Sequence, residues 1–366
     1  MIADDPALQS LVDRVRAARA AGTALCIQGG GSKGFLGEAA HGEPLDVTVL
    51  RGISSYEPTE LVVTARCGTL LSDLEAVLAD AGQCLPFEPP HFGPTATVGG
   101  MVAAGLAGPA RAAMGGVRDY VLGATLLNGR AEVLSFGGQV IKNVAGYDVS
   151  RLLAGSFGVL GVVCEVSLKV LPLARATDTL RFELTQAAAI TQLNAWAGQP
   201  LPLGASAWWN ETLVVRLQGA VAAVEAAAAR LGGEHIEAAQ AAAFWAGLRE
   251  QSDEYFAGAA RQVEADASVR LWRLGVPQTA GPLALPGEQL VEWGGGQRWL
   301  CSAAAPSAVR TAAAAAGGHA TIFRAHDKSS GVFTPLDAPL ARIHRELKRA
   351  FDPDRVFNRG RLYPDL

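Results

Sequence analysis

The sequence predicts an α+β fold that is divided into two domains. The chain has 366 residues, which is more than a single hydrophobic core usually organises. Its first half alternates helical and strand periodicities around glycine-rich loops. Beyond Pro172, residues 180–231 follow the order strand, helix, strand, strand, helix, which is typical of an antiparallel sheet backed by helices. The polar stretch 172–179 therefore marks the predicted boundary between the domains.

Apolar spacing and turn residues predict the elements of the first half. Leu8, Leu11 and Val15 recur at helical spacing, and Gly22 ends that helix. Short apolar runs bounded by glycine or polar residues predict strands, and the long apolar run before Pro172 predicts a central strand or strand pair. The predicted elements are strands at 23–28, 46–50 and 61–66, a helix at 69–82, and the central strand or strand pair at 159–170.

The same reasoning places strands at 180–184, 204–210 and 212–218 in the second half, with an alanine-rich helix at 220–231. Near the C-terminus, Pro339 stands at a helix start. The apolar Leu340, Ile343, Leu347 and Phe351 share one face of this helix. We expect the residues that follow to pack back onto the first domain.

Composition excludes several classes of function. The net charge is −4 and the 31 Lys and Arg residues are scattered, so there is no basic stripe for nucleic acid. No apolar run reaches the roughly 20 residues that a membrane span needs, and no leader pattern precedes residue 6, so we expect a cytoplasmic protein. The five cysteines form no C-x-x-C pair, which argues against disulfides and an iron–sulfur cluster. The histidines show no close ligand spacing, and we expect no metal site.

The first glycine cluster, at residues 29–34, has the letter pattern G-x-G-x-x-G of a dinucleotide-binding loop. Such a loop must open into a helix, yet residues 35–44 contain two glycines and a proline, which no helix accommodates. Consecutive glycines can instead turn their N–H groups toward one point and bind a diphosphate without a helix. A plain glycine turn remains the alternative, and Lys33 either adds charge to the loop or lies in solvent.

Two further clusters are dense in small residues. Residues 94–108 contain Thr97, Gly99, Gly100 and Ala103, which allow close backbone approach to a flat ligand. Residues 142–148 and 151–163 form the third cluster, in which glycines interrupt an apolar strand as they do where a ligand presses against it. A small-residue packing seam explains the second cluster equally well when it is taken alone, and a turn with a core strand explains the third.

Taken together and in this order, the clusters resemble the vanillyl-alcohol-oxidase, or PCMH-type, FAD-binding family. Motifs along the whole chain are similar to the FAD-binding subunits of bacterial glycolate oxidase (glycolate dehydrogenase); they lie at 27–37, 58–61, 84–91, 142–148, 285–290, 317–321 and 357–364. The resemblance implies a PCMH-type two-part FAD-binding domain at 1–173, a cap domain of antiparallel sheet and helices at 174–332, and a segment at 333–366 that returns to the first domain.

The resemblance also implies roles for individual residues. The pyrophosphate of FAD would be held by Gly29, Gly30, Gly31, Ser32, Lys33 and Gly34. The flavin would be lined by Thr97, Gly99, Gly100 and Ala103, and the adenosine half would meet the backbone of Gly158, Gly161 and Val163. Asn358 would approach the isoalloxazine edge, although Arg359 stands where the family usually has proline. Some relatives tether FAD covalently, but the loop offers no His or Cys, so we expect non-covalent FAD; His91 and Cys84 remain alternatives.

The expected activity is oxidation of glycolate, with D-lactate as a second candidate, by hydride transfer to flavin. The resemblance implies a second FAD-containing subunit and an iron–sulfur subunit as partners, and a location at the inner membrane only through that complex. No catalytic residue is identified; candidates for a carboxylate clamp or base are Arg298, His319, Arg324 and His326. Two alternatives remain: a flavin-fold scaffold that stabilises a catalytic partner, and, more weakly, a stand-alone sugar or lactone oxidase.

Overall fold

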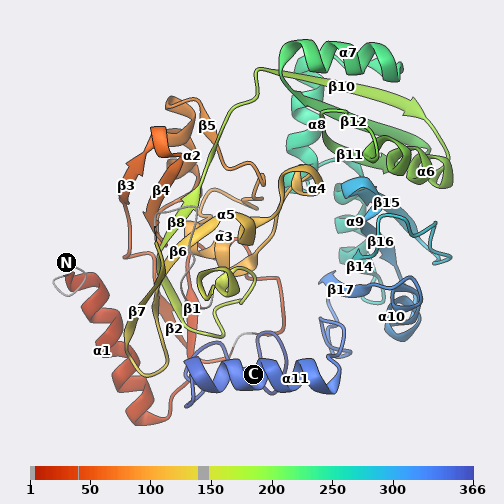
Figure 1. Ribbon diagram of the computed structural model, residues 1–366. Coiled ribbons are helices and arrows are strands. Elements are labelled where there is room, and N and C mark those ends of the chain that lie inside the picture. The colour runs from red at the N-terminus through yellow and green to blue at the C-terminus, as the bar shows by residue number, and fades with distance from the viewer. Residues whose placement is uncertain (1–4, 40, 139–147) are drawn as a thin grey trace.

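The computed structural model describes residues 5–39, 41–138 and 148–366, and two β-sheets organise them (Figure 1). We call the described residues up to 172 the first lobe and residues 176–324 the second lobe. Among the described residues, the first lobe holds a five-stranded sheet and the second an eight-stranded sheet. The mixture of helices with antiparallel sheets confirms the predicted α+β fold class.

The first lobe begins with helix α1 (Pro6–Ala21) and a parallel pair of strands, β1 (Leu25–Gln28) and β2 (Glu43–Asp46). The Asp5 side chain accepts hydrogen bonds from the first N–H groups of α1, and Gly22 ends the helix with φ +68°. The predicted strand at 46–50 is wrong. β2 ends at Asp46, and the following residues turn so that Leu50 N–H donates to Val47 O (3.2 Å), which buries both side chains under α1.

The five-stranded sheet is antiparallel, in the order β3-β4-β8-β6-β7. Its strands are β3 (Ile53–Glu57), β4 (Val62–Arg66), β6 (Val121–Leu127), β7 (Val133–Gly137) and β8 (Val162–Lys169). The apolar run before Pro172 forms β8, which is the central strand, as its continuous hydrophobicity predicted. A 3-10 helix, η1 (Pro58–Glu60), joins β3 to β4.

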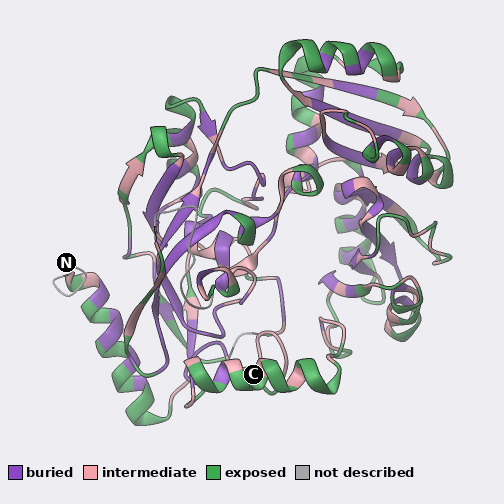
Figure 2. Ribbon diagram, in the orientation of Figure 1, coloured by how far each residue is buried: buried purple, intermediate pink, exposed green. Residues whose placement is uncertain are grey.

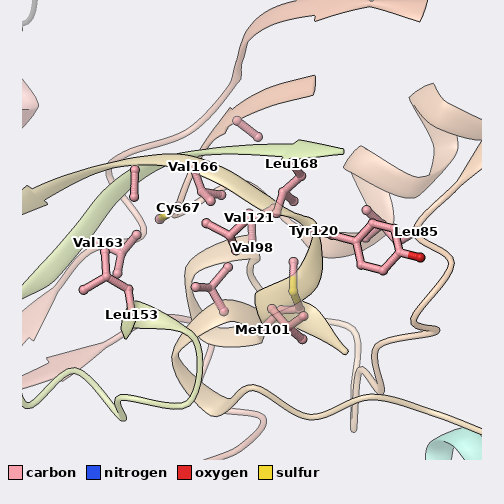
Figure 3. Packing of buried hydrophobic residues seen from close by; sticks show 14 of the residues in the cluster. Cys67, Leu85, Val98, Met101, Tyr120, Val121, Leu153, Val163, Val166 and Leu168 are labelled. Atoms are coloured by element: carbon pink, nitrogen blue, oxygen red, sulfur yellow. The ribbon is translucent and has the colours of Figure 1, made fainter. Parts of the chain in front are cut away.

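Helices α2 (Leu71–Asp80) and α3 (Val98–Ala104) cover one face of this sheet. Figure 3 shows Val98 and Met101 of α3 packed toward Val121 of β6 and Val166 of β8. Shorter elements complete the lobe: β5 (Gln83–Cys84), α4 (Arg111–Met114), α5 (Val117–Tyr120), η2 (Ser150–Leu153) and β9 (Leu171–Pro172). The core therefore lies between the sheet and the segment that carries the second glycine cluster.

The eight-stranded sheet of the second lobe is antiparallel throughout, in the order β13-β10-β12-β11-β15-β16-β14-β17. Its strands are β10 (Ala176–Glu183), β11 (Leu203–Trp209), β12 (Thr212–Gly219), β13 (Glu234–His235), β14 (Arg270–Gly275), β15 (Glu288–Glu292), β16 (Gln297–Ser302) and β17 (His319–Arg324). The predicted strands at 180–184, 204–210 and 212–218 fall on β10, β11 and β12.

Helices cover both faces of this sheet (Figure 1). One face packs against α6 (Gln186–Ala197), α7 (Val221–Leu231) and α10 (Pro306–Ala315). The other packs against α8 (Ala238–Glu250) and α9 (Glu254–Ala265), and this core includes Leu36 and Leu106 of the first lobe. The shared core places the second face of the sheet against the first lobe.

Trp293 fixes one contact between the lobes. It begins η3 (Trp293–Gly295) in the second lobe, and its indole N–H donates to the Gly108 carbonyl of the first lobe (3.0 Å). The guanidinium of Arg111 lies 4.6 Å from the Trp293 ring centroid, and that of Arg273 lies 5.2 Å away. The ring therefore contacts one cation from each lobe, which stabilises the contact through cation–π attraction.

Helix α11 (Ala338–Phe351) and the residues after it return to the first lobe. Leu25 N–H donates to Val356 O (2.7 Å), and Asn358 N–H donates to Leu25 O (2.9 Å), so the chain end lies beside β1. A fully buried ion pair anchors this segment, in which Lys348 Nζ donates to Asp352 Oδ2 (2.8 Å).

Both partners of this ion pair also bond to the backbone around them. Lys348 Nζ donates to the carbonyls of Val159 and Phe357, both at 2.8 Å. Asp352 accepts from the N–H groups of Val356 and Phe357, also at 2.8 Å. One buried pair thus ties α11, the chain end and the first lobe together.

Replacing Lys348 by methionine should strongly destabilise the protein, because it leaves the Asp352 carboxylate buried without its cation. We expect Lys348→Met to lower the free energy of unfolding by roughly 3–5 kcal/mol, measured by urea denaturation at pH 7. Arg349→Met is the matched control, since Arg349 pairs with Glu346 on the surface and its loss should cost under about 1 kcal/mol. Equal stability of the two variants would contradict the anchoring role.

Candidate functional site

The structure brings all three glycine clusters to one pocket of about 420 Å³, which lies in the first lobe beside the chain end. Its volume lies within the range typical of small-molecule sites. Each residue that the sequence singled out for the cofactor lines it: Gly29, Gly30, Gly31, Ser32, Lys33, Gly34, Thr97, Gly99, Gly100, Ala103, Gly158, Gly161, Val163 and Asn358. Residues 142–147 of the third cluster lie outside the described residues.

The loop that follows β1 presents bare backbone to this pocket. Within the described part of the chain, the N–H groups of residues 29–33 donate to no acceptor. Gly31 has φ +73°, and a Cβ built there would meet nothing within 4 Å. No helix follows the loop, because residues 32–38 continue as turns and bends. Successive free N–H groups of this kind bind anionic oxygens, so the loop fits a diphosphate and is not a Rossmann turn.

The second cluster holds this loop in place. Thr95 Oγ1 donates to Gly30 O (2.5 Å), and a Cβ on Gly30 would lie 1.4 Å from the Thr95 carbonyl oxygen. Glycine is therefore required at position 30 by close backbone approach. Thr97 caps α3 by accepting from Gly100 N–H (3.1 Å), which orients the small residues of that helix along the pocket.

Asn358, which lies near the C-terminus, forms part of the pocket wall. Its Oδ1 accepts from Ile27 N–H (2.8 Å), and its Nδ2 donates to Phe157 O (2.6 Å). The amide therefore joins β1 to the third cluster. Arg359 occupies the position where proline was expected, and Asn358 still reaches the pocket wall because its own backbone is bonded to Leu25.

Two cationic side chains that the sequence analysis did not select bind backbone carbonyls at the C-terminal end of the glycine loop. Lys328 Nζ donates to the carbonyls of Phe35 (2.5 Å) and Gly37 (3.1 Å). Arg361 lines the pocket and donates from Nη2 to Gly34 O (2.9 Å). The arginine lies within the motif at 357–364 and could have been found there, whereas no sequence signal marks Lys328.

Lys33 is half-buried at the pocket and does not lie in open solvent. Its Nζ donates to the His91 carbonyl (3.0 Å) and lies 5.6 Å from the Phe92 ring centroid. Burial lowers the pKa of Lys33 to about 8, and the nearby Glu250 carboxylate opposes that shift. The ammonium is therefore charged at neutral pH and loses its proton a little above it.

The structure places the four candidates for a carboxylate clamp or base in different surroundings. Arg298 is fully buried and donates to the carbonyls of Gly295 (2.7 Å) and Ala280 (2.8 Å), away from the pocket. His319 lies against Gly275 at the start of β17, and His326 is exposed. Arg324 alone of the four faces the glycine-loop side, with its guanidinium 3.7 Å from the Phe35 ring centroid.

Arg324 is a cation held close to the pocket by aromatic rings. It also lies 5.7 Å from the Phe92 centroid, and burial lowers its pKa. Among the described residues it makes no ion pair. A guanidinium without a carboxylate partner is suited to bind one from a ligand.

Neither alternative covalent tether lines the pocket. His91 Nε2 lies 2.9 Å from Glu75 Oε2, and Cys84 lies in a separate cavity beside Pro86 and Glu88. In the ranges that the structure describes, no group of three His, Cys, Asp or Glu side chains could hold a metal ion. No helix among these residues is long and apolar enough to cross a membrane.

Comparison with known proteins agrees with this geometry. A sequence model described as "FAD binding domain" matches residues 8–137. Glycolate oxidase subunit GlcE of Escherichia coli (strain K12) is 48% identical over 358 residues, which cover 98% of each chain. The chain belongs to this family of FAD-binding glycolate oxidase subunits. FAD is its cofactor, and the chain is of the FAD-dependent oxidoreductase class.

More distant relatives match part of the chain. D-lactate dehydrogenase of Anaerostipes hadrus is 32% identical over 41% of this chain and 32% of its own length. Glycolate oxidase subunit GlcD of Bacillus subtilis (strain 168) is 30% identical over the same shares. A solved structure of alkyldihydroxyacetonephosphate synthase superposes with a TM-score of 0.65 at 14% identity, covering 96% of this chain and 74% of that one. That likeness shows that the two share a fold.

Substituting Gly30 should abolish tight FAD binding, because an added Cβ forces the loop away from Thr95. We expect Gly30→Ala to weaken FAD binding by about 3 kcal/mol, or roughly hundredfold in Kd, measured by fluorescence titration of the apoprotein. Gly281→Ala is the matched control, since a Cβ there meets nothing within 4 Å. Retention of wild-type affinity by Gly30→Ala would show that this loop does not hold the cofactor.

FAD affinity should depend on pH through Lys33. The ammonium is charged below its pKa of about 8 and favours an anionic ligand there, so affinity should fall as pH rises from 7 to 9.5. Lys33→Met should bind FAD about tenfold more weakly at pH 7, the worth of one charged hydrogen bond, and should show a flatter pH profile. The same titration repeated at each pH measures both effects, and an identical slope in the variant would assign the dependence to another group.

Proposed function

We propose that this chain is the FAD-binding subunit of a glycolate oxidase complex and takes part in oxidising glycolate, with D-lactate as a second candidate, to the 2-oxo acid. The observation that carries the proposal is the bare-backbone pocket, in which three glycine clusters meet around free N–H groups. The choice of substrate is supported by the relatives, which include a glycolate oxidase subunit at 48% identity and D-lactate dehydrogenases.

In this proposal, residues 1–173 and 333–366 hold FAD without a covalent bond, and residues 174–332 form the cap. The N–H groups of residues 29–33 bind the diphosphate, while Lys328 and Arg361 hold the loop that carries them. Bound FAD supplies a hydride acceptor for the α-hydrogen of the substrate. Arg324 orients the substrate carboxylate, and the rings of Phe35 and Phe92 beside it exclude water.

The pocket that we assign to FAD does not itself supply a base for the substrate. The residues lining the described pocket include no histidine or carboxylate to accept the hydroxyl proton. The relatives that are named as glycolate oxidase subunits support partners that complete the reaction, for which we propose a second FAD-containing subunit and an iron–sulfur subunit. We place the protein in the cytoplasm, at the inner membrane only through those partners.

A scaffold without its own turnover is the second candidate function. The lack of a histidine or carboxylate among the residues lining the cofactor pocket favours it, whereas the intact glycine loop favours a working cofactor, because a scaffold has no need for free N–H groups in that pocket. The two differ in whether electrons from substrate reach the FAD of this chain.

The deciding experiment is an anaerobic spectrum of the purified full chain before and after addition of glycolate, repeated with D-lactate and then with the partner subunits present. We expect a yellow protein whose flavin band bleaches once partners are supplied. Arg324→Leu should need a higher glycolate concentration for the same bleaching, because the carboxylate loses its cation.

Each other outcome has a distinct meaning. Bleaching of the isolated chain would make it an enzyme in its own right. A flavin band of this subunit that stays oxidised while the assembled complex turns over would establish the scaffold. A colourless protein that cannot be reconstituted with FAD would overturn the proposal.

A further inference from the structure

A second cavity, which we call the α8 cavity, has a volume of about 500 Å³ and lies in the second lobe. One face of α8 lines it, together with residues 177–179 of β10 and Arg216 of β12. Figure 1 shows α8 beside these strands. Glu88 adds a wall from the first lobe. None of these residues lines the cofactor pocket, so the two are separate sites.

Small side chains on α8 leave the room for this cavity. Ala238 is followed at helical spacing by Ala241, Ala242 and Ala246, so the four share one face of the helix, and all of them line the cavity. The helix carries both buried and exposed residues (Figure 2): Ala241 and Trp245 are buried, whereas the other three alanines are exposed. The cavity therefore opens beside the exposed alanines and ends at the Trp245 ring. An apolar wall with a few polar groups is typical of sites for small organic molecules.

Arg216 is the charged group at the buried end of the α8 cavity. Its side chain is 8% exposed, and its guanidinium carbon lies 5.1 Å from the Trp245 ring centroid. Nη2 lies 2.7 Å from Glu88 Oε1 at an angle that makes no hydrogen bond, and Nε has no hydrogen-bond partner among the described residues. Buried donors of this kind cost free energy until an acceptor is supplied.

Arg249 brings a second guanidinium to the same cavity. Its Nε donates to Glu250 Oε1 (2.9 Å), whereas Nη1 and Nη2 donate to no residue that the structure describes. The Thr179 hydroxyl accepts from the Trp245 indole N–H (3.1 Å) and donates to no described residue. The cavity therefore presents unused donors from two cations and one hydroxyl.

The carboxylates of the cavity are already supplied with donors. Glu88 accepts from Ala110 N–H (2.9 Å) in addition to its ion pair. Asp178 pairs with His235 (3.0 Å) and accepts from Thr179 N–H (2.8 Å). Because these acceptors are used and the arginine donors are not, the cavity lacks acceptor oxygens. A ligand carboxylate can supply two of them to a guanidinium.

Charge and shape together define the ligand. The two arginines and two carboxylates that line the cavity balance each other, so a ligand with a single carboxylate is favoured over a phosphate or a dicarboxylate, whose further charge would meet Glu88 and Asp178. The alanine wall fits an apolar body, which glycolate lacks.

We propose that the α8 cavity binds a small organic monocarboxylate with an apolar body. Its carboxylate accepts from the free N–H groups of Arg216 and Arg249, and its body packs on the alanines of α8. This site is distinct from the one proposed for glycolate, and it does not rest on the proposed function.

The test is isothermal titration calorimetry of the full, FAD-loaded chain at pH 7 with benzoate, phenylacetate and hexanoate, each of which joins one carboxylate to an apolar body. We expect binding of one molecule per chain. Benzamide keeps the ring without the charge, and acetate keeps the charge without the body, so both should bind about tenfold or more weakly. Failure of all three carboxylates to bind, or equal binding of benzamide, would overturn the inference.

Two variants locate the binding. Arg249→Met removes a guanidinium that is 33% exposed, and Ala242→Trp fills the cavity from its open side, so both should fold and keep their FAD absorbance. Each should weaken probe binding about tenfold or more. Arg261→Met and Ala243→Trp are the matched controls, since both residues are exposed and line neither the α8 cavity nor the cofactor pocket. Wild-type affinity in both Arg249→Met and Ala242→Trp would overturn the inference.

A further variant separates this site from the proposed substrate site. Arg324→Leu should keep wild-type affinity for the probes. Loss of binding in Arg324→Leu, with binding retained in Ala242→Trp, would place the probes beside the cofactor and overturn the α8 site while leaving the proposed function intact. A chain that cannot hold FAD would overturn the proposed function, whereas probe binding to that chain, lost in Ala242→Trp, would still support the α8 site.

Discussion

The buried ion pair between Lys348 and Asp352 is the interaction on which the cofactor site depends. Each partner bonds both to the other and to backbone, and together they hold the chain end beside β1. Asn358 follows six residues after Asp352 and joins two walls of the pocket. A charge this deeply buried costs free energy unless it is paired and hydrogen-bonded, so the pair forms only when the segment is correctly docked. The pocket is thereby completed by the last residues of the chain.

The pocket itself depends on the absence of side chains. Gly30 touches the Thr95 carbonyl so closely that no Cβ fits, and the N–H groups beside it remain free for a ligand. Backbone donors are fixed by the fold and need no side-chain ordering to bind an anion, which suits the diphosphate of a tightly held cofactor. Lys328 and Arg361 donate to carbonyls at the exit of the loop and so keep its N–H groups directed toward the pocket.

The second lobe brings few of the candidate side chains to the glycine-loop side. Its sheet faces the first lobe and shares a core with it, yet Arg324 is the one candidate from its late strands that reaches the glycine-loop side. Trp293 contacts Arg111 and Arg273 where the two lobes meet.

The sequence by itself determined the fold class, the strands β1, β4, β8, β10, β11 and β12, the helices α1, α2, α7 and α11, and, through the family resemblance, many of the residues that line the pocket. The elements depend on local constraints, because apolar spacing identifies them, and glycine is needed wherever backbone must approach a ligand or another chain segment. The strand expected at 46–50 failed because alternating apolar residues fit a strand and a buried turn equally well, and only packing under α1 decides between them. The sequence could not distinguish Arg298 from Arg324, because both are arginines in late strands. Arg298 donates hydrogen bonds to backbone carbonyls, whereas Arg324 faces the glycine loop. Tertiary structure alone brought Lys328 and Arg361 to a loop 291 to 327 residues earlier, since contacts between distant segments are set by how whole elements pack.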